Sequence, residues 1–126
     1  MSQTHPPKVL VVDDSRAVRV HVERILTDAG YEVITAEDGV EALDCLNQHP
    51  ALIVLDVNMP RLDGYGVCER LSELGSTFQR LPVIFLTSLE SKALELLGRE
   101  FGAYLHKPVS QNELLSAVKS QLKAPS

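Results

Sequence analysis

The chain has 126 residues, of which 44% are hydrophobic and 23% are charged, as expected for one globular domain with a single core. The net charge is −5, with 17 acidic and 12 basic residues, so the composition does not support a nucleic-acid-binding surface. No apolar run is long enough to span a membrane, and residues 1–8 lack the apolar segment of a signal peptide. We therefore expect a cytoplasmic protein with no direct nucleic-acid or membrane partner.

The 2 cysteines and 4 histidines show no metal-ligand or redox spacing. Two reduced thiols are the simpler interpretation of the cysteines, in agreement with an intracellular location. The histidines are interpreted as incidental. These six residues are Cys45, Cys68, His5, His21, His49 and His106.

The first predicted strand is the apolar run 9–12, which follows an irregular leader at residues 1–7. Such a run is typical of a parallel strand covered on both faces. It ends on two acids, Asp13 and Asp14, and Ser15 is expected to cap the helix that follows. The buried face of this helix is predicted to consist of Val18, Val22, Ile25, Leu26 and Ala29.

Gly30 is expected to end that helix, since glycine readily adopts the left-handed backbone conformation found there. Residues 31–36 are predicted to form a strand of mixed pattern nearer a sheet edge. Asp38 and Glu41 resemble a capping box at the start of a short helix. The short helix is predicted to run through Val40, Leu43 and Leu46.

A second apolar run, at residues 52–55, ends on Asp56. The turn-forming pairs at 59–60 (Met-Pro) and 63–64 (Asp-Gly) follow, so Asp56 lies where a buried strand opens into a loop. In an open α/β sheet, ligands bind just outside the carboxyl ends of the strands. Asp56 is therefore placed for chemistry rather than for packing.

Helices and strands are also predicted to alternate in the rest of the chain. A third helix is predicted around residues 67–74, a strand at 83–86 that ends at Thr87, and a fourth helix around 94–101. A short strand at 103–106 stops at Lys107. A final helix begins with a capping box from Ser110 and Glu113 and is predicted to bury Leu115, Val118 and Leu122, with residues 124–126 as a tail.

Five strands alternating with five helices predict an α/β fold with a doubly wound, five-stranded parallel sheet and right-handed crossovers. The residues suited to chemistry all fall at strand ends. Because the carboxyl ends of parallel strands meet at one edge of a sheet, these side chains are expected to gather there. They are Asp13, Asp14, Asp56, Thr87 and Lys107.

Three carboxylates at adjacent strand ends repel one another, so a bound cation is favoured there, and Mg²⁺ suits such oxygen ligands. Taken alone, residues 13–14 could be a solvated acidic turn, Thr87 a turn residue and Lys107 a surface lysine. Taken together, a metal, a carboxylate nucleophile, a cation and a hydroxyl describe phosphoryl transfer onto Asp56.

These motifs resemble the receiver domain of two-component response regulators, and the resemblance covers nearly the whole chain, residues 8–123. It implies a flavodoxin-like fold with strand order 2-1-3-4-5, as in chemotaxis receivers. It is carried by Asp13-Asp14, Asp56 with Met59-Pro60 and Asp63-Gly64, Thr87, and Lys107-Pro108.

The resemblance implies that Asp56 accepts a phosphoryl group from a sensor histidine kinase, a phosphotransfer protein or a small phosphodonor. The protein would then be a phosphorylation-dependent switch that controls an output partner, and not a classical enzyme. A phosphorylation-dependent homodimer is compatible with this interpretation.

The same resemblance implies roles for the other residues. Mg²⁺ would be bound by Asp14, Asp56 and the backbone carbonyl of Asn58, with Asp13 acting mostly through water. The phosphoryl group would be held by Thr87 and Lys107. Tyr104 would swing inward behind Thr87 during switching, and the Lys107–Pro108 peptide bond would be cis.

Two other classes of protein fit parts of the pattern. A small phosphatase could use Asp56 as a transient nucleophile, but it would need a general acid two residues further on, where the chain has Asn58. A flavodoxin-like electron carrier would need a phosphate-binding loop after the first strand. The acids Asp13 and Asp14 at that place would repel a phosphate.

Overall fold

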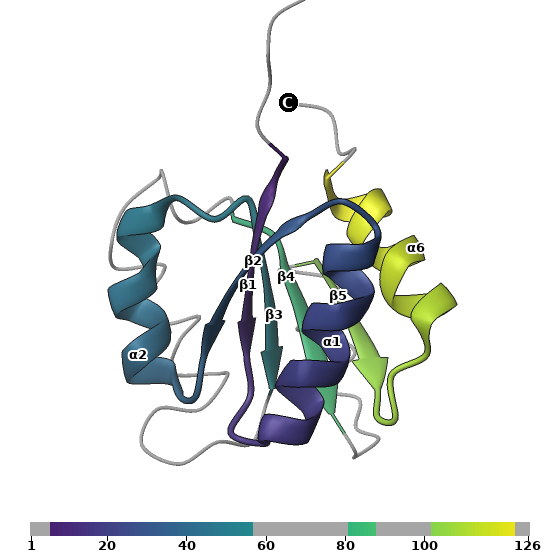
Figure 1. The fold of residues 1–126 in the computed structure, drawn as a ribbon, viewed down its shortest axis with the longest axis horizontal. Coiled ribbons are helices and arrows are strands. Elements are labelled where there is room, and N and C mark those ends of the chain that lie inside the picture. Colours follow the sequence, from purple (N-terminus) through teal and green to yellow (C-terminus); the bar gives the residue numbers. More distant parts are fainter. Residues whose placement is uncertain (1–5, 57–80, 88–101, 123–126) are drawn as a thin grey trace, which may run out of the picture.

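The fold is described from a computed structural model over residues 6–56, 81–87 and 102–122. In these ranges five strands and three α-helices follow the predicted alternation (Figure 1). The helices predicted around residues 67–74 and 94–101 lie outside the described residues. The elements are β1 (Lys8–Val12), α1 (Arg16–Asp28), β2 (Glu32–Ala36), α2 (Gly39–Asp44), the 3₁₀-helix η1 (Cys45–Gln48), β3 (Leu52–Asp56), β4 (Val83–Thr87), β5 (Gly102–His106) and α6 (Gln111–Leu122).

All five strands form one parallel sheet in the order β2-β1-β3-β4-β5, which confirms the predicted order. β3 is central, and the pairings Val12 with Leu55 and Asp56 with Leu86 bring the carboxyl ends of β1, β3 and β4 to the same edge. β2 lies at the edge of the sheet as predicted, and four of its five residues are not fully buried, in keeping with its mixed sequence.

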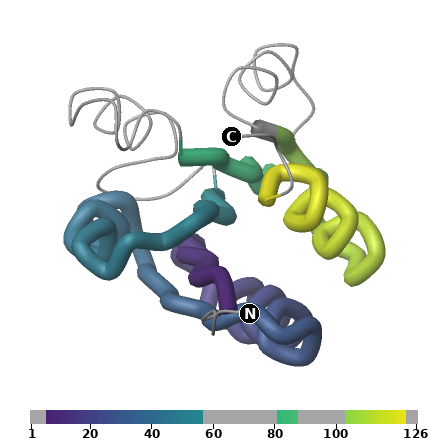
Figure 2. Tube along the Cα trace, turned by 90° about the horizontal axis from the view of Figure 1, so that it is seen from above, coloured from purple at the N-terminus to yellow at the C-terminus, as the bar shows by residue number. Residues whose placement is uncertain are grey.

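Helices cover both faces of the sheet (Figure 2). On one face, α1 and α6 pack against alternate residues of the strands, and on the other face α2 and η1 do so. The four apolar residues of β1, the four of β3 and the first four of β4 are buried, because these strands have helices or neighbouring segments on both sides. This two-sided burial explains why their sequences lack polar alternation.

Helix α1 begins and ends where the sequence predicts. The Ser15 hydroxyl accepts a hydrogen bond from the Val18 backbone N–H at 3.3 Å, and Gly30 follows the helix with a φ of 98°. The buried face is narrower than predicted. Ala29 is exposed because it is the residue that caps the carboxyl end, beyond the last turn. Val22, Ile25 and Leu26 are buried as expected.

Helix α2 is shorter than its pattern suggests and continues as η1. Asp38 caps it by accepting a hydrogen bond from the Glu41 N–H at 2.8 Å, while the Glu41 carboxylate accepts from the Glu37 N–H. Val40 is 38% exposed, and Ala42 contacts the sheet instead, because the helix turns its small side chain toward the strands.

Helix α6 shows the predicted capping at Ser110. The Ser110 hydroxyl accepts from the Glu113 N–H at 3.1 Å and donates to the Glu113 carboxylate at 3.0 Å. The buried residues are Leu114 and Val118, whereas Leu115 is only partly buried. Val118 is buried as predicted, Leu115 and Leu122 pack against the core while only partly buried, and Leu114 is the core residue that the prediction did not include.

The sequence predicts reduced cysteines and no membrane-spanning segment, and both predictions can be compared with the described part of the chain. Cys45 lies half-buried at the start of η1 without a disulfide, and burial, followed by the nearby Glu41 and Asp44, raises the pKa of its thiol. Within the described residues, no helix is long and apolar enough to cross a membrane.

Candidate functional site

The predicted site residues lie together at the carboxyl edge of the sheet. Asp56 and Thr87 are the last residues of β3 and β4, and both are buried. Asp13 follows β1 directly and is fully buried, and Lys107 follows β5 directly and is half-buried. Asp14 is exposed at the same edge. Asn58 lies outside the described residues.

The strand register decides which face of the sheet these side chains approach. Asp56 pairs with Leu86, whose side chain packs on the α1 and α6 face, and Lys107 comes one residue after His106 in β5. Thr87 pairs with His106. Since successive side chains of a strand alternate between faces, Asp56 and Lys107 belong to the α1 and α6 face, and Thr87 and His106 to the other.

The three carboxylates form one compact cluster. Asp13, Asp14 and Asp56 each offer a carboxylate oxygen, and these oxygens all lie within 4.8 Å of one another. Bringing three negative charges this close is unfavourable without a cation between them. Two carboxylates that are buried and one that is open to solvent suit a hard cation that keeps part of its water shell, so the residues present fit Mg²⁺.

Asp13 is held by two contacts, one with Ser15 at the cap of α1 and one with Arg19 within α1. The Ser15 backbone N–H donates to Asp13 Oδ1 at 2.9 Å, and Arg19 Nη1 donates to the Asp13 backbone carbonyl at 2.7 Å. One contact orients the carboxylate and the other holds the backbone. Asp13 therefore has a defined position relative to the helix.

Lys107 brings the positive charge to this cluster. Its Nζ lies 2.9 Å from Asp13 Oδ2 and 3.4 Å from Asp56 Oδ1. Burial on its own lowers the pKa of Lys107, but the hydrogen bonds and the attraction of Asp13 and then Asp56 outweigh burial, so the pKa is raised. The Lys107 backbone N–H also donates to the Thr87 carbonyl at 2.7 Å, and the bond to Pro108 is cis, as predicted.

Tyr104 lies two residues before the end of β5. It is half-buried against the apolar cluster on the α2 face and pairs in register with Phe85. Its ring contacts the His106 ring edge-on, with centroids 5.6 Å apart. By the alternation of side chains, Tyr104 and Thr87 belong to the same face of the sheet.

Sequence reasoning missed His21, which lies on α1 close to the site. His21 Nε2 lies 3.0 Å from the backbone carbonyl of Val109, two residues beyond Lys107. The two partners are 88 positions apart in the chain, so no local motif could have indicated the contact. Among the described residues, this contact between His21 and Val109 links α1 to the loop that carries Lys107.

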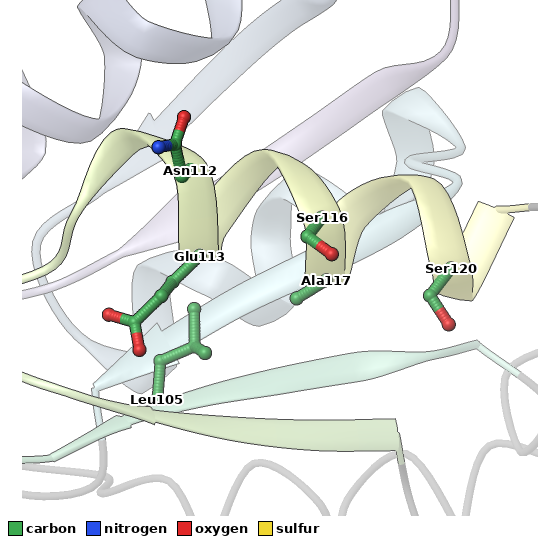
Figure 3. Close-up of a pocket in the computed structure, with 6 residues that line it drawn as sticks. All are labelled: Leu105, Asn112, Glu113, Ser116, Ala117 and Ser120. Carbon is green, nitrogen blue, oxygen red and sulfur yellow. The ribbon is translucent and has the colours of Figure 1, made fainter.

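A cavity of about 620 Å³ lies away from the acidic cluster, between β5 and α6 (Figure 3). Apart from Leu105, its walls are small or polar side chains, and the carboxylate of Glu113, its one ionisable residue, already accepts a hydrogen bond from the Ser110 hydroxyl at the cap of α6. No strand-end residue of the acidic cluster contributes to it. The lining residues are Leu105, Asn112, Glu113, Ser116, Ala117 and Ser120.

The fold and the strand-end cluster are those of a receiver domain, and the chain belongs to the response regulator receiver domain family, whose profile matches residues 9–119. The match confirms the resemblance drawn from the sequence motifs. It falls within the domain predicted at residues 8–123, whose exact boundaries stay a prediction.

The curated relatives that the chain matches are roughly twice its length. The chain is 46% identical over 119 residues to a probable transcriptional regulator, ycf27, of Cyanophora paradoxa, covering 92% of this chain and 48% of that protein. It is 45% identical over 124 residues to the response regulator MprA of Mycobacterium sp. (strain KMS), covering 96% and 53%. The chain thus spans about half the length of the curated relatives it matches.

Solved structures show the same architecture. The chemotaxis protein CheY4 of Vibrio cholerae superposes with a TM-score of 0.84 at 36% identity, covering 93% of this chain and 99% of that one. A putative response regulator from Chloroflexus aurantiacus superposes with a TM-score of 0.83 at 36% identity, covering 93% and 98%. This chain is therefore a two-component receiver domain with a flavodoxin-like fold.

Proposed function

We propose that Asp56 is the phosphoacceptor of a Mg²⁺-dependent signalling switch. A phosphoryl group passes from a phosphohistidine, or from a small donor such as acetyl phosphate, to a carboxylate oxygen of Asp56. The bond between phosphorus and the donor atom breaks, an O–P bond forms at Asp56, and the electron pair stays with the leaving group. Acetyl phosphate releases acetate, and a phosphohistidine releases a histidine ring whose nitrogen takes up a proton.

The main support for this proposal is the set of groups that surround Asp56. Its side chain is nearly buried at the end of the central strand, with Lys107 Nζ 3.4 Å away and two further carboxylates in the same cluster. A carboxylate beside a cation and a metal-binding cluster is suited to nucleophilic attack on phosphorus.

Mg²⁺ is proposed to bind to Asp14 and Asp56, with Asp13 acting through water and with the Asn58 carbonyl as a further ligand. The grouping of the three carboxylates within 4.8 Å supports this assignment for the described residues. When bound, the ion supplies neutralisation of charge on the phosphoryl oxygens. Exposure of Asp14 leaves one side of the cluster open to the donor.

Lys107 and Thr87 are proposed to hold the transferred phosphoryl group. Lys107 already lies beside Asp56, and its compact ammonium on a flexible stem can turn from Asp13 to a phosphoryl oxygen without moving the backbone. The Thr87 hydroxyl can donate a hydrogen bond to another oxygen. A hydrogen bond from the Lys107 N–H to the Thr87 carbonyl joins the backbones of the two residues, so the distance between them is fixed.

Switching is proposed to pass from Thr87 to Tyr104. Phosphorylation adds up to about two negative charges at Asp56 and draws the Thr87 hydroxyl toward the new oxygens. The space that Thr87 leaves lies on the face of the sheet where Tyr104 is only half-buried. Inward rotation of Tyr104 would fill this space and change the surface beside β5.

A sensor histidine kinase or a phosphotransfer protein is the proposed phosphodonor. The relatives named as a probable transcriptional regulator and as a response regulator support control of transcription as the output. That output would be carried by a partner or by a segment comparable to the part of those proteins that this chain does not match. The chain itself acts as the switch and not as a classical enzyme.

The test is intact mass after incubation with acetyl phosphate, with and without Mg²⁺. We expect one phosphoryl adduct in the wild type with Mg²⁺, none without it, and none in Asp56→Asn. Asp28→Asn, which alters an exposed carboxylate at the end of α1, should still form the adduct. An adduct on Asp56→Asn, or none on a folded wild type, would overturn the proposal.

A further inference from the structure

We propose that His21 is a positioning residue for Lys107. Its ring Nε2 donates a hydrogen bond to the Val109 carbonyl and so holds the loop after β5 against α1. The inference rests on the proposed function, because Lys107 matters here as the group that binds the phosphoryl oxygens. It adds a residue outside the strand-end cluster to the machinery of the site.

The direction of the hydrogen bond follows from its partners. A backbone carbonyl only accepts, so the nitrogen that faces Val109 must carry the proton. The neutral ring with its proton on Nε2 and the fully protonated ring both satisfy this requirement. The contact is therefore a directed link from a helix side chain to a loop backbone.

The loop that His21 holds begins at Lys107 and ends at the cap of α6. At its start, the Lys107 N–H donates to the Thr87 carbonyl, and at its end Ser110 caps the helix. Pro108 between them has no N–H to donate and is exposed. The Val109 carbonyl thus gives α1 a hydrogen-bond acceptor in the middle of the loop.

Side chains fill the space between α1 and this loop only in part. An apolar hollow of about 210 Å³ lies between them, so the hydrogen bond to His21 adds to the contact that the buried side chains make. The side chain of Val109 is buried in the core and anchors one side of the residue, while the hydrogen bond to His21 anchors its carbonyl. The hollow is lined by Ala17, Val18, His21, Lys107, Pro108 and Val109.

The same helix also holds the partner of Lys107. Arg19, two residues before His21, donates to the Asp13 carbonyl at 2.7 Å. The loop after β1 and the loop after β5 are therefore both tied to α1, and the 2.9 Å contact between Lys107 and Asp13 bridges them. Without His21, one of these two ties is lost, and the Lys107 ammonium is held less closely to Asp56.

The test compares two ligands that report on different parts of the site. Beryllium fluoride, which mimics a phosphoryl group on a carboxylate, depends on Lys107, whereas Mg²⁺ alone depends on the carboxylates. Both affinities are measured by isothermal titration calorimetry, with Mg²⁺ saturating for beryllium fluoride. In His21→Ala, we expect beryllium fluoride to bind roughly two- to tenfold more weakly, the effect of one lost hydrogen bond, and Mg²⁺ affinity to stay unchanged.

Conservative and control variants separate positioning from general stability. His21→Gln keeps a donor at a similar reach and should restore the affinity for beryllium fluoride. His21→Met keeps the length without a donor and should behave like His21→Ala. Glu23→Ala, at an exposed position of the same helix, should bind both ligands as the wild type does. Because His21 is itself exposed in a helix, these variants are expected to fold, which thermal unfolding checks.

The experiment distinguishes a failure of the proposed role of His21 from a failure of the proposed function. Wild-type protein that binds Mg²⁺ but not beryllium fluoride overturns both. A wild type that binds both ligands, beside a His21→Ala variant that binds them equally well, overturns only the role of His21. The same holds if His21→Ala weakens both ligands alike, or if His21→Gln fails to restore binding.

Discussion

Lys107 is the residue whose charge holds the acidic cluster together in the described part of the chain. Its Nζ lies 2.9 Å from Asp13 and 3.4 Å from Asp56, and removing it would leave carboxylates facing one another. Its pKa is raised because the attraction of the two acids outweighs burial. A group with a raised pKa stabilises the fold fully below its unfolded value, 10.5, and this contribution is lost as pH rises through the higher folded value.

Replacing Lys107 by Met should lower the free energy of unfolding by about 1–3 kcal/mol at neutral pH, because buried carboxylates lose their partner. The difference from the wild type should shrink as pH rises above 10.5, since the wild-type lysine then loses its own charge. Urea unfolding across this pH range measures both effects.

The exposed Lys119 of α6 offers a matched control. Lys119→Met should change the free energy of unfolding by less than about 0.5 kcal/mol at neutral pH. If the effect of Lys107→Met stayed constant far above pH 10.5, the ion pair would not be its cause.

At the scale of elements, the ends of helices were easier to predict than their faces. Ser15, Gly30, Asp38 and Ser110 all act at helix ends as predicted, because a hydroxyl, a carboxylate or a missing Cβ acts on its immediate neighbours. Which helical residues are buried depends on where the sheet lies. That is why Ala42 is buried and Val40 is exposed, and why Leu114 is fully buried while Leu115 is only partly buried against the core.

Gly30 follows α1 in a backbone conformation that favours glycine. Its φ of 98° is a conformation that side chains rarely adopt, although a Cβ there would meet nothing within 4 Å. Gly30→Ala should therefore lower the free energy of unfolding by about 1–2 kcal/mol through backbone strain and not through a clash. Gly30→Asn should cost less, because asparagine tolerates positive φ better. Equal stability of Gly30→Ala and the wild type in urea unfolding would contradict this account.

At the scale of the whole molecule, the acidic cluster exists only when the sheet is assembled. Asp13 and Asp14 follow β1, Asp56 ends β3, and the pairing of these two strands brings their carboxylates within 4.8 Å. An unfolded chain would present these acids separately. A cation that needs them together therefore binds the folded state and stabilises it by mass action.

Mg²⁺ should thus raise the Tm of the wild type by several degrees, since a concentration 100 times the Kd stabilises by about 2.7 kcal/mol. Asp14→Asn should reduce this shift, and Asp28→Asn, outside the cluster, should keep it. Thermal unfolding with increasing MgCl₂ is the measurement. Equal shifts in the two variants would place the bound ion elsewhere.

The sequence by itself determined the alternation of strands and helices and the position of the acids at strand ends, because periodicity and capping are local properties of the chain. Comparison with a known family supplied the strand order, which no local pattern contains. Only the tertiary structure decided that Lys107 meets Asp13 and that His21 meets Val109. Such contacts join residues far apart in the chain, and their distances depend on strand order, register and helix placement together.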